Sequence, residues 1–124
     1  MANQEEILNA AFGHFANWPA EKTQFEALLH ADVHWVETDE ELGRGDHRGK
    51  PAVMAHLDHI KEHVTSASLI SVRQRPPGWQ TRDEMQVDGH GVHCCITDVD
   101  FTGDLISRVI HCKGHFEVGQ GPCR

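Results

Sequence analysis

The stretch FEALLHADVHWVETDEELGRGDHRGKPAVMAHLDHI, residues 25–60, decides the fold. It starts inside a short predicted helix over residues 22–30 and continues as a strand-like segment over residues 32–37. A polar, glycine-containing loop over residues 38–49 follows, and a second helix begins near Lys50-Pro51, where proline is tolerated in the first turn. A helix, a strand and another helix joined by a polar loop predict a compact unit of mixed secondary structure.

The strand in this stretch carries an unusual acid. Val33, Trp35 and Glu37 alternate with two other residues, and alternate residues of a strand share one face. We therefore expect the Glu37 carboxylate to point into an apolar space, which solubility alone does not explain. The competing interpretation places Glu37 at a solvated strand end, paired with Arg44 or Arg48.

The flanking sequence supplies the other elements. Residues 5–17 predict a helix, because apolar residues recur at spacings of three and four. Strands are predicted over residues 67–74, 79–87, 92–101 and 105–118, separated by glycine- and proline-containing turns at residues 76–78, 88–91 and 102–104. Helices early and hairpins late predict an α+β fold, with the helices packed on one face of a curved sheet.

Three pieces of the chain resemble the NTF2-like superfamily, which includes the ketosteroid isomerases and the SnoaL-like polyketide cyclases. They are FEALLHADVHWVE, HRGKPAVMAHL and DVDFTGDLISRVIH. The resemblance implies an NTF2-like (cystatin-like) cone, in which three N-terminal helices pack on a curved, mostly antiparallel sheet. It also implies one domain over residues 1–118, a flexible C-terminal tail over residues 119–124, and a homodimer formed through the outer face of the sheet.

The resemblance also implies a site. The general base of ketosteroid isomerases and many SnoaL-like members falls on Glu37 here, and an apolar pocket should raise the pKa of this acid. The family's second acid lies four residues before the phenylalanine of the late hairpin, which corresponds to Thr97 here. Asp98 is one residue nearer to Phe101. Either a bulge turns Asp98 inward or the second acid is absent. The family's helix-one tyrosine is absent, because the chain has no tyrosine.

Scytalone dehydratase, in the same superfamily, uses histidines, so one of His14, His34, His93 or His111 can enter the pocket as an acid. The residues do not decide which of them does. Our candidate catalytic set is Glu37, Asp98 and His111. The expected substrate-binding residues are Phe12, Phe15, Trp35, Met54, Leu57, Trp79 and Thr97.

Histidines and cysteines raise the question of a metal. His56, His59 and His63 lie on one flank of the helix after Lys50, and we interpret that flank as exposed rather than as a metal site. We expect no metal and no cofactor. Cys94 and Cys95 are adjacent, so they point to opposite faces of a strand, and at least one is expected in the core.

Composition limits the partners. The chain has 124 residues and a net charge of −8, which disfavours nucleic acid as a partner. No apolar run approaches the roughly 20 residues of a membrane helix. The acidic start lacks a signal-peptide layout, so we expect a cytoplasmic protein.

The sequence therefore predicts a SnoaL-like enzyme, an isomerase, cyclase or dehydratase, that transfers a proton on an apolar carbonyl compound. The alternative is a non-catalytic ligand-binding or assembly module with the same pocket. A third possibility is a metal-dependent hydrolase built from the histidines. The residues alone do not decide whether the chain is an enzyme.

Overall fold

The computed structural model describes residues 3–114. Its helices are α1 (Gln4–Ala16), α2 (Lys22–Glu26), the short 3-10 helix η1 (Glu40–Leu42) and α3 (Lys50–His63). Its strands are β1 (Leu29–Glu37), β2 (Gly45–Arg48), β3 (Val64–Arg75), β4 (Gly78–Val87), β5 (Gly91–Thr102) and β6 (Leu105–Gly114). The predicted tail, and the predicted end of the last strand over residues 115–118, lie outside the described residues.

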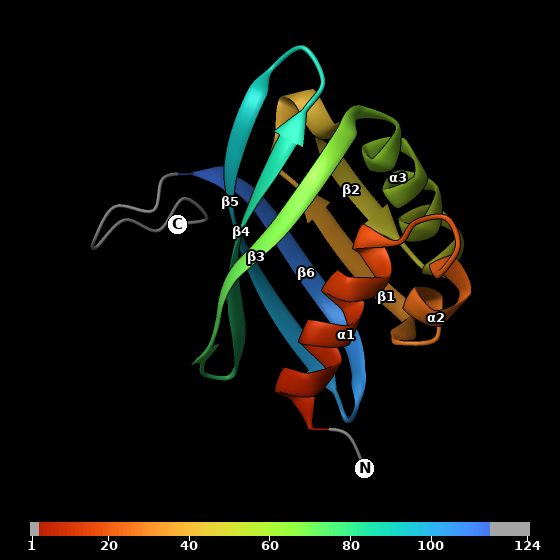
Figure 1. The fold of residues 1–124 in the computed structure, drawn as a ribbon. Helices are drawn as coiled ribbons and strands as arrows, with labels where there is room; N and C mark the ends of the chain where they lie inside the picture. Colours follow the sequence, from red (N-terminus) through yellow and green to blue (C-terminus); the bar gives the residue numbers. More distant parts are fainter. Residues whose placement is uncertain (1–2, 115–124) are drawn as a thin grey trace.

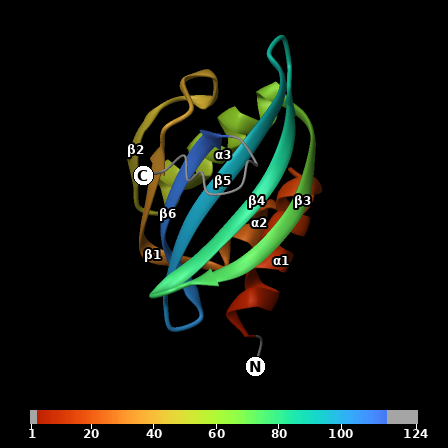
Figure 2. The same ribbon diagram turned by 90° about the vertical axis from the view of Figure 1, so that its left-hand side faces the viewer.

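The strands form one six-stranded sheet in the order β2-β1-β6-β5-β4-β3. All neighbours are antiparallel except β1 and β6, which run parallel. Figures 1 and 2 show a curved sheet with α1, α2 and α3 on one face. The predicted α+β class and the mostly antiparallel curved sheet are thus confirmed.

The helices differ in detail from the prediction. The described residues contain three α-helices, but α3 follows β1 and β2 and is not N-terminal to the sheet. The second helix has only five residues and ends at Glu26, short of the predicted residue 30. The reason is tertiary: Leu29 pairs with Ile106 in the parallel ladder, so the chain is already part of the sheet there. The predicted polar loop also contains β2, which pairs with β1.

Local sequence explains the two long helices. Asn3 caps α1, because its side chain accepts a hydrogen bond from the Glu6 backbone N–H at 2.8 Å. Gly49 precedes α3 with a φ of 85°, a conformation that residues with a Cβ rarely adopt, and Pro51 follows in the first turn. The backbone N–H of Gly49 donates to the Val33 carbonyl at 2.7 Å and ties the start of α3 to β1.

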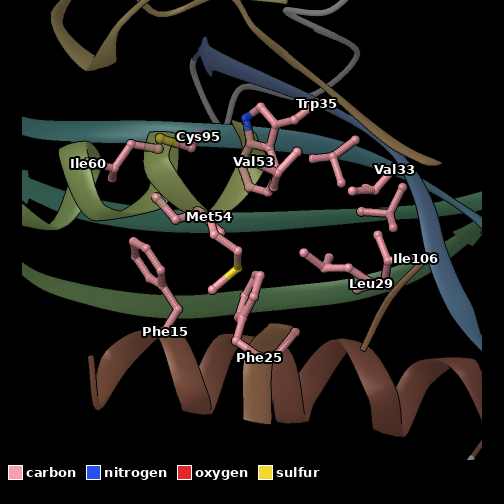
Figure 3. Packing of buried hydrophobic residues seen from close by; sticks show 14 of the residues in the cluster. Phe15, Phe25, Leu29, Val33, Trp35, Val53, Met54, Ile60, Cys95 and Ile106 are labelled. Atoms are coloured by element: carbon pink, nitrogen blue, oxygen red, sulfur yellow. The ribbon is translucent and has the colours of Figure 1, made fainter. Parts of the chain in front are cut away.

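The core lies between the helices and the concave face of the sheet (Figure 3). Val33, Trp35 and Glu37 of β1 all point into this space, at 0%, 8% and 1% exposure. The expectation that Glu37 shares a buried face with Val33 and Trp35 is therefore confirmed. No helix in the described part of the chain is long and apolar enough to cross a membrane.

Candidate active site

A cavity of about 90 Å³ lies between the helices and the concave face of the sheet. Most of its wall is apolar and comes from α1, α2, α3 and the sheet strands. Its apolar residues include Leu8, Ala11, Phe12, Phe15, Trp35, Leu57 and Ile60. Its polar wall is formed on β4, β5 and β6 by Thr81, Asp83, Thr97 and His111. An apolar chamber with a few convergent polar groups is typical of a small-molecule site.

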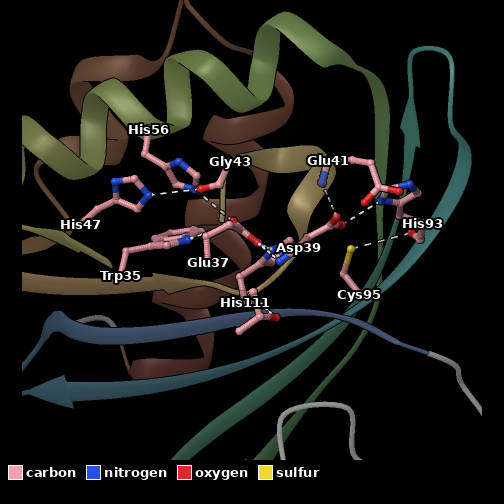
Figure 4. Close-up of polar contacts among 11 residues, drawn as sticks. Trp35, Glu37, Asp39, Glu41, Gly43, His47, His56, His93, Cys95 and His111 are labelled. Carbon is pink, nitrogen blue, oxygen red and sulfur yellow. Dashed lines mark hydrogen bonds and ion pairs between the residues drawn. The ribbon is translucent and has the colours of Figure 1, made fainter. Parts of the chain in front are cut away.

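Glu37 lies behind His111 and does not line the cavity. Both of its carboxylate oxygens accept hydrogen bonds (Figure 4). Oε1 accepts from His56 Nε2 at 2.9 Å and from Trp35 Nε1 at 3.3 Å. Oε2 accepts from His111 Nδ1 at 2.6 Å and from the backbone N–H of Asp39 at 3.3 Å. Glu37 therefore holds two imidazoles in fixed orientations.

Glu37 and His111 each stabilise the charged form of the other. Burial alone would raise the pKa of Glu37, but the charge and hydrogen bond of His111 and the hydrogen bond of His56 lower this pKa to about 2. Burial alone would lower the pKa of His111, but the Glu37 carboxylate raises it well above 6.5. The expectation that the pocket raises the pKa of Glu37 is wrong, because two histidines surround this carboxylate.

Asp83 supplies a second buried carboxyl at the cavity wall. It is 2% exposed, and burial raises its pKa to about 6, despite the opposing effect of His111. Asp83 Oδ2 and His111 Nε2 are buried atoms without a hydrogen-bond partner among the described residues. Buried polar atoms are paired in most proteins, so these two atoms beside one cavity are candidate contacts for an ordered water or a ligand.

A second acid–histidine pair borders this site. His93 Nδ1 donates to Asp39 Oδ2 at 2.8 Å, and both residues are buried. The Cys95 thiol lies beside this pair and points toward the His93 carbonyl oxygen at 3.8 Å. Cys95 is fully buried and Cys94 is half-buried, which confirms that at least one of these cysteines belongs to the core.

The structure brings most of the predicted pocket residues together. Phe12, Phe15, Trp35, Leu57, Thr97 and His111 all line the cavity. Met54 is buried in the core without lining the cavity. Trp79 is half-buried at the edge of the core, where its indole N–H donates to Gln4 Oε1 at 2.8 Å.

Asp98 lies on the opposite face of the sheet. Its carboxylate accepts hydrogen bonds from Arg75 at 3.1 Å and from Gln80 at 3.0 Å. Its strand pairs regularly at this position, and the irregularity of the β5–β6 ladder falls between Asp100 and Phe101. The bulge that would turn Asp98 inward is therefore absent, and Thr97 is the residue of this pair that faces the cavity.

One expectation and one competing interpretation for charged residues are wrong. His56 was expected on an exposed flank of the helix, but it is 5% exposed and packs between Glu37 and a stacked His47 ring. Glu37 is not at a solvated strand end, and Arg44 instead pairs with Glu40. Of the candidate histidines, only His111 lines the cavity; the others pair with acids elsewhere: His14 with Glu21, His34 with Asp46 and His93 with Asp39.

Sequence reasoning missed Asp83 and His56. Asp83 alternates with Thr81 and Met85 in a strand that was correctly predicted, so the same period-two argument that selected Glu37 applies to it. His56 lies three residues after Val53 and four before Ile60, which places it next to the apolar stripe of α3. These two signals were present in the sequence.

Comparisons with known proteins identify the fold. No protein-family model matches the sequence, and no curated protein matches it significantly. Among solved structures, Bal32a from a soil-derived mobile gene cassette aligns with a TM-score of 0.77 and 14% identity, over 87% of this chain and 86% of that one. An NTF2-like protein of unknown function from Burkholderia pseudomallei aligns with a TM-score of 0.73 and 14% identity, over 92% of each chain.

A third similar structure is a protein from Catenulispora acidiphila with a ketosteroid isomerase-like fold, in complex with trimethylamine. Its TM-score is 0.70 and its identity 10%, over 88% of this chain and 85% of that one. Identities this low establish a shared architecture and not a shared activity. The chain therefore has the NTF2-like fold, the architecture that its sequence motifs predicted.

Proposed function

We propose that this protein is a small-molecule enzyme that transfers a proton on a compact, apolar carbonyl compound, with Asp83 and His111 as its acid–base pair. The observation that carries the proposal is the pair of buried, unpartnered atoms, Asp83 Oδ2 and His111 Nε2, in the wall of an otherwise apolar cavity. A substrate that places a C–H bond and a carbonyl oxygen there supplies the missing partners.

The roles of the groups follow from their contacts. The Asp83 carboxylate accepts the proton from the carbon beside the carbonyl, and the electron pair of that C–H bond moves to the carbonyl oxygen. The Nε2–H of His111 donates to this oxygen and stabilises the developing enolate. Return of the proton at another carbon gives isomerisation, and loss of a leaving group gives dehydration. These are two of the reaction classes that the sequence predicted.

Glu37 acts as a positioning residue in this scheme. Its Oε2 fixes His111 Nδ1 at 2.6 Å, so the Nε2 of the same ring is presented to the cavity. The general-base role that the sequence assigned to Glu37 thus moves to Asp83, because both Glu37 oxygens are occupied and neither borders the cavity.

The cavity limits the size of the substrate. Typical ligand pockets hold about 300–1,000 Å³, whereas a dry cavity of about 150 Å³ already binds benzene. A cavity of about 90 Å³ therefore suits a compound of roughly one small ring or less.

The second candidate function is a ligand-binding or assembly module without catalysis. The small, mostly apolar cavity favours it, since binding alone needs no acid–base pair. The similar structure from Catenulispora acidiphila holds trimethylamine, so a member of this fold binds a small molecule without a reaction being implied. Homodimerisation through the outer face of the sheet and a cytoplasmic location stay predictions.

Hydrogen exchange on substrate carbon tests the proposal. A panel of small ketones and enones in deuterated buffer is followed by NMR for deuterium uptake beside the carbonyl. We expect uptake with the wild type and a loss of about 10²–10⁴-fold in Asp83→Asn and His111→Gln, the range for a general acid or base. Asp98→Asn, on the outer face, is the control. Equal uptake in the wild type and Asp83→Asn, or binding of a ketone without any uptake, would favour the binding module.

A further inference from the structure

We infer that Asp83, Cys95 and His111 form a binding site for a thiophilic divalent cation of the Zn²⁺ class. One ligand atom from each of these buried side chains lies within 4.8 Å of the other two. A carboxylate oxygen, a thiolate sulfur and an imidazole nitrogen are the three donor types that zinc binds in proteins. The inference rests on this donor set and does not depend on the proposed reaction.

The sheet builds this group from three adjacent strands. Asp83 of β4 pairs directly with Cys95 of β5, so their side chains lie beside each other on the concave face. His111 of β6 pairs with Thr97, two residues along β5 from Cys95, and thus lies diagonal to it on the same face. Ligands on paired strands are held more rigidly than ligands on loops.

Two of the three donors have free ligand atoms aimed at this space. Asp83 Oδ2 and His111 Nε2 are buried and have no hydrogen-bond partner within residues 3–114. The Cys95 thiol lies 3.8 Å from the His93 carbonyl oxygen and interacts with the His111 ring, so its sulfur faces the same space. Zinc binds its ligands at about 2.0–2.3 Å, so small side-chain rotations bring the three atoms onto one ion.

The surroundings of His111 resemble those of a metal ligand. Histidines that bind metals commonly donate their second ring nitrogen to a carboxylate, which fixes the ring and its tautomer. Glu37 Oε2 accepts this bond from His111 Nδ1 at 2.6 Å, and His56 and Trp35 in turn hold the Glu37 carboxylate. The nitrogen that faces the cluster is thereby Nε2.

The ion would have an open position. Asp83 and His111 line the cavity, whereas Cys95 is fully buried and does not line it. Three protein ligands with the fourth position facing a pocket is the arrangement of catalytic rather than structural zinc sites. Because the ion uses the same Asp83 and His111 atoms as the proton transfer proposed above, an occupied site cannot perform that transfer.

This inference departs from the sequence-based expectation of a metal-free protein. It also differs from the histidine cluster on α3 that the sequence suggested. There His59, Glu62 and His63 can approach one ion, but His59 and Glu62 are exposed. Variants of that surface cluster therefore serve as the control for variants of the buried cluster in a metal titration.

Cobalt titration tests the inference without any substrate. The intact protein is stripped with a chelator under reducing conditions and titrated with Co²⁺, whose bond to a thiolate gives a near-ultraviolet charge-transfer band. We expect this band to saturate at one ion per chain and Zn²⁺ to displace it. It should persist in Cys94→Ser and in the double variant His59→Gln/His63→Gln, and disappear in Cys95→Ser.

A second variant guards against misfolding of Cys95→Ser. Asp83→Asn keeps the thiolate and removes one ligand, and it should stay folded because burial disfavours the Asp83 carboxylate, so the band should remain while the affinity for Co²⁺ falls well below that of the wild type. A wild type without the band, or a band that survives in folded Cys95→Ser, overturns the inference. Loss of the band in the surface variant alone overturns it as well, because the ion would then lie on α3.

Discussion

His111 Nδ1 lies 2.6 Å from Glu37 Oε2, across the one parallel ladder of the sheet. The two residues are direct partners in the β1–β6 register, although 74 positions separate them in the chain. Both side chains are buried, so the pair replaces solvent as the partner of each charge. This relationship orients the ring that lines the cavity and explains why Glu37 is anionic there.

Removal of the Glu37 charge should destabilise the fold. Glu37→Gln leaves His111 and His56 without their buried anion, and breaking a buried pair costs about 3–5 kcal/mol of unfolding free energy. Urea denaturation at neutral pH measures the change. Glu40→Gln removes an exposed acid paired with Arg44 and should cost less than about 1 kcal/mol. Equal losses in the two variants would contradict the buried role of Glu37.

Asp83 should lower stability at neutral and alkaline pH. Its folded pKa of about 6 lies above the ordinary 3.8, so folding disfavours its ionised form. The cost is absent below pH 3.8, grows as pH rises and is complete above pH 6. Asp83→Asn should therefore raise the unfolding free energy at pH 8 by about 2 kcal/mol more than at pH 4.

This pH effect is measured in the presence of a chelator, so that no ion occupies the cluster. Asp98→Asn is the matched control, since Asp98 lies on the outer face between Arg75 and Gln80. A pH-independent effect of Asp83→Asn would mean that Asp83 is not buried as described.

His56 should matter far more than its helix neighbour His59. His56→Ala removes a ring that fills buried space, stacks on His47 at 3.9 Å and donates to Glu37 at 2.9 Å. We expect a loss of about 2–4 kcal/mol, as for other disrupted buried networks, and a change within about 0.5 kcal/mol for exposed His59→Ala. Thermal unfolding of the two variants side by side checks this order, and a reversed order would restore the exposed-flank interpretation.

Filling the cavity should block ligands while the protein stays folded. Ala11→Leu adds side-chain volume to the α1 wall of the cavity, where Ala11 is 7% exposed. Overpacking costs about 1–3 kcal/mol, so the variant should remain folded. Deuterium uptake by the small ketones should fall at least tenfold, whereas Ala10→Leu, on the exposed side of α1, should leave it unchanged. Unchanged uptake in both variants would place the reaction outside this cavity.

Much of the fold and part of the site could be predicted from local patterns. Period-two alternation placed Glu37 on the buried face of β1, and helical spacing identified α1 and α3 with small errors at their ends. The same alternation in β4 places Asp83 on the buried face with Thr81 and Met85. Asp98 entered the candidate catalytic set because the resemblance implies a second acid near Thr97, whereas the regular β5 pairing turns Asp98 outward.

The sequence by itself determined which residues face inward, because strand and helix periods are local properties of the chain. Only the tertiary structure decided what those residues meet. The parallel pairing of β1 with β6 brings His111 to Glu37, and α3 brings His56 to the same carboxylate. Two histidines therefore reverse the pKa shift that burial alone predicts for Glu37. Partners that lie far apart in the chain set this charge, and no local pattern encodes them.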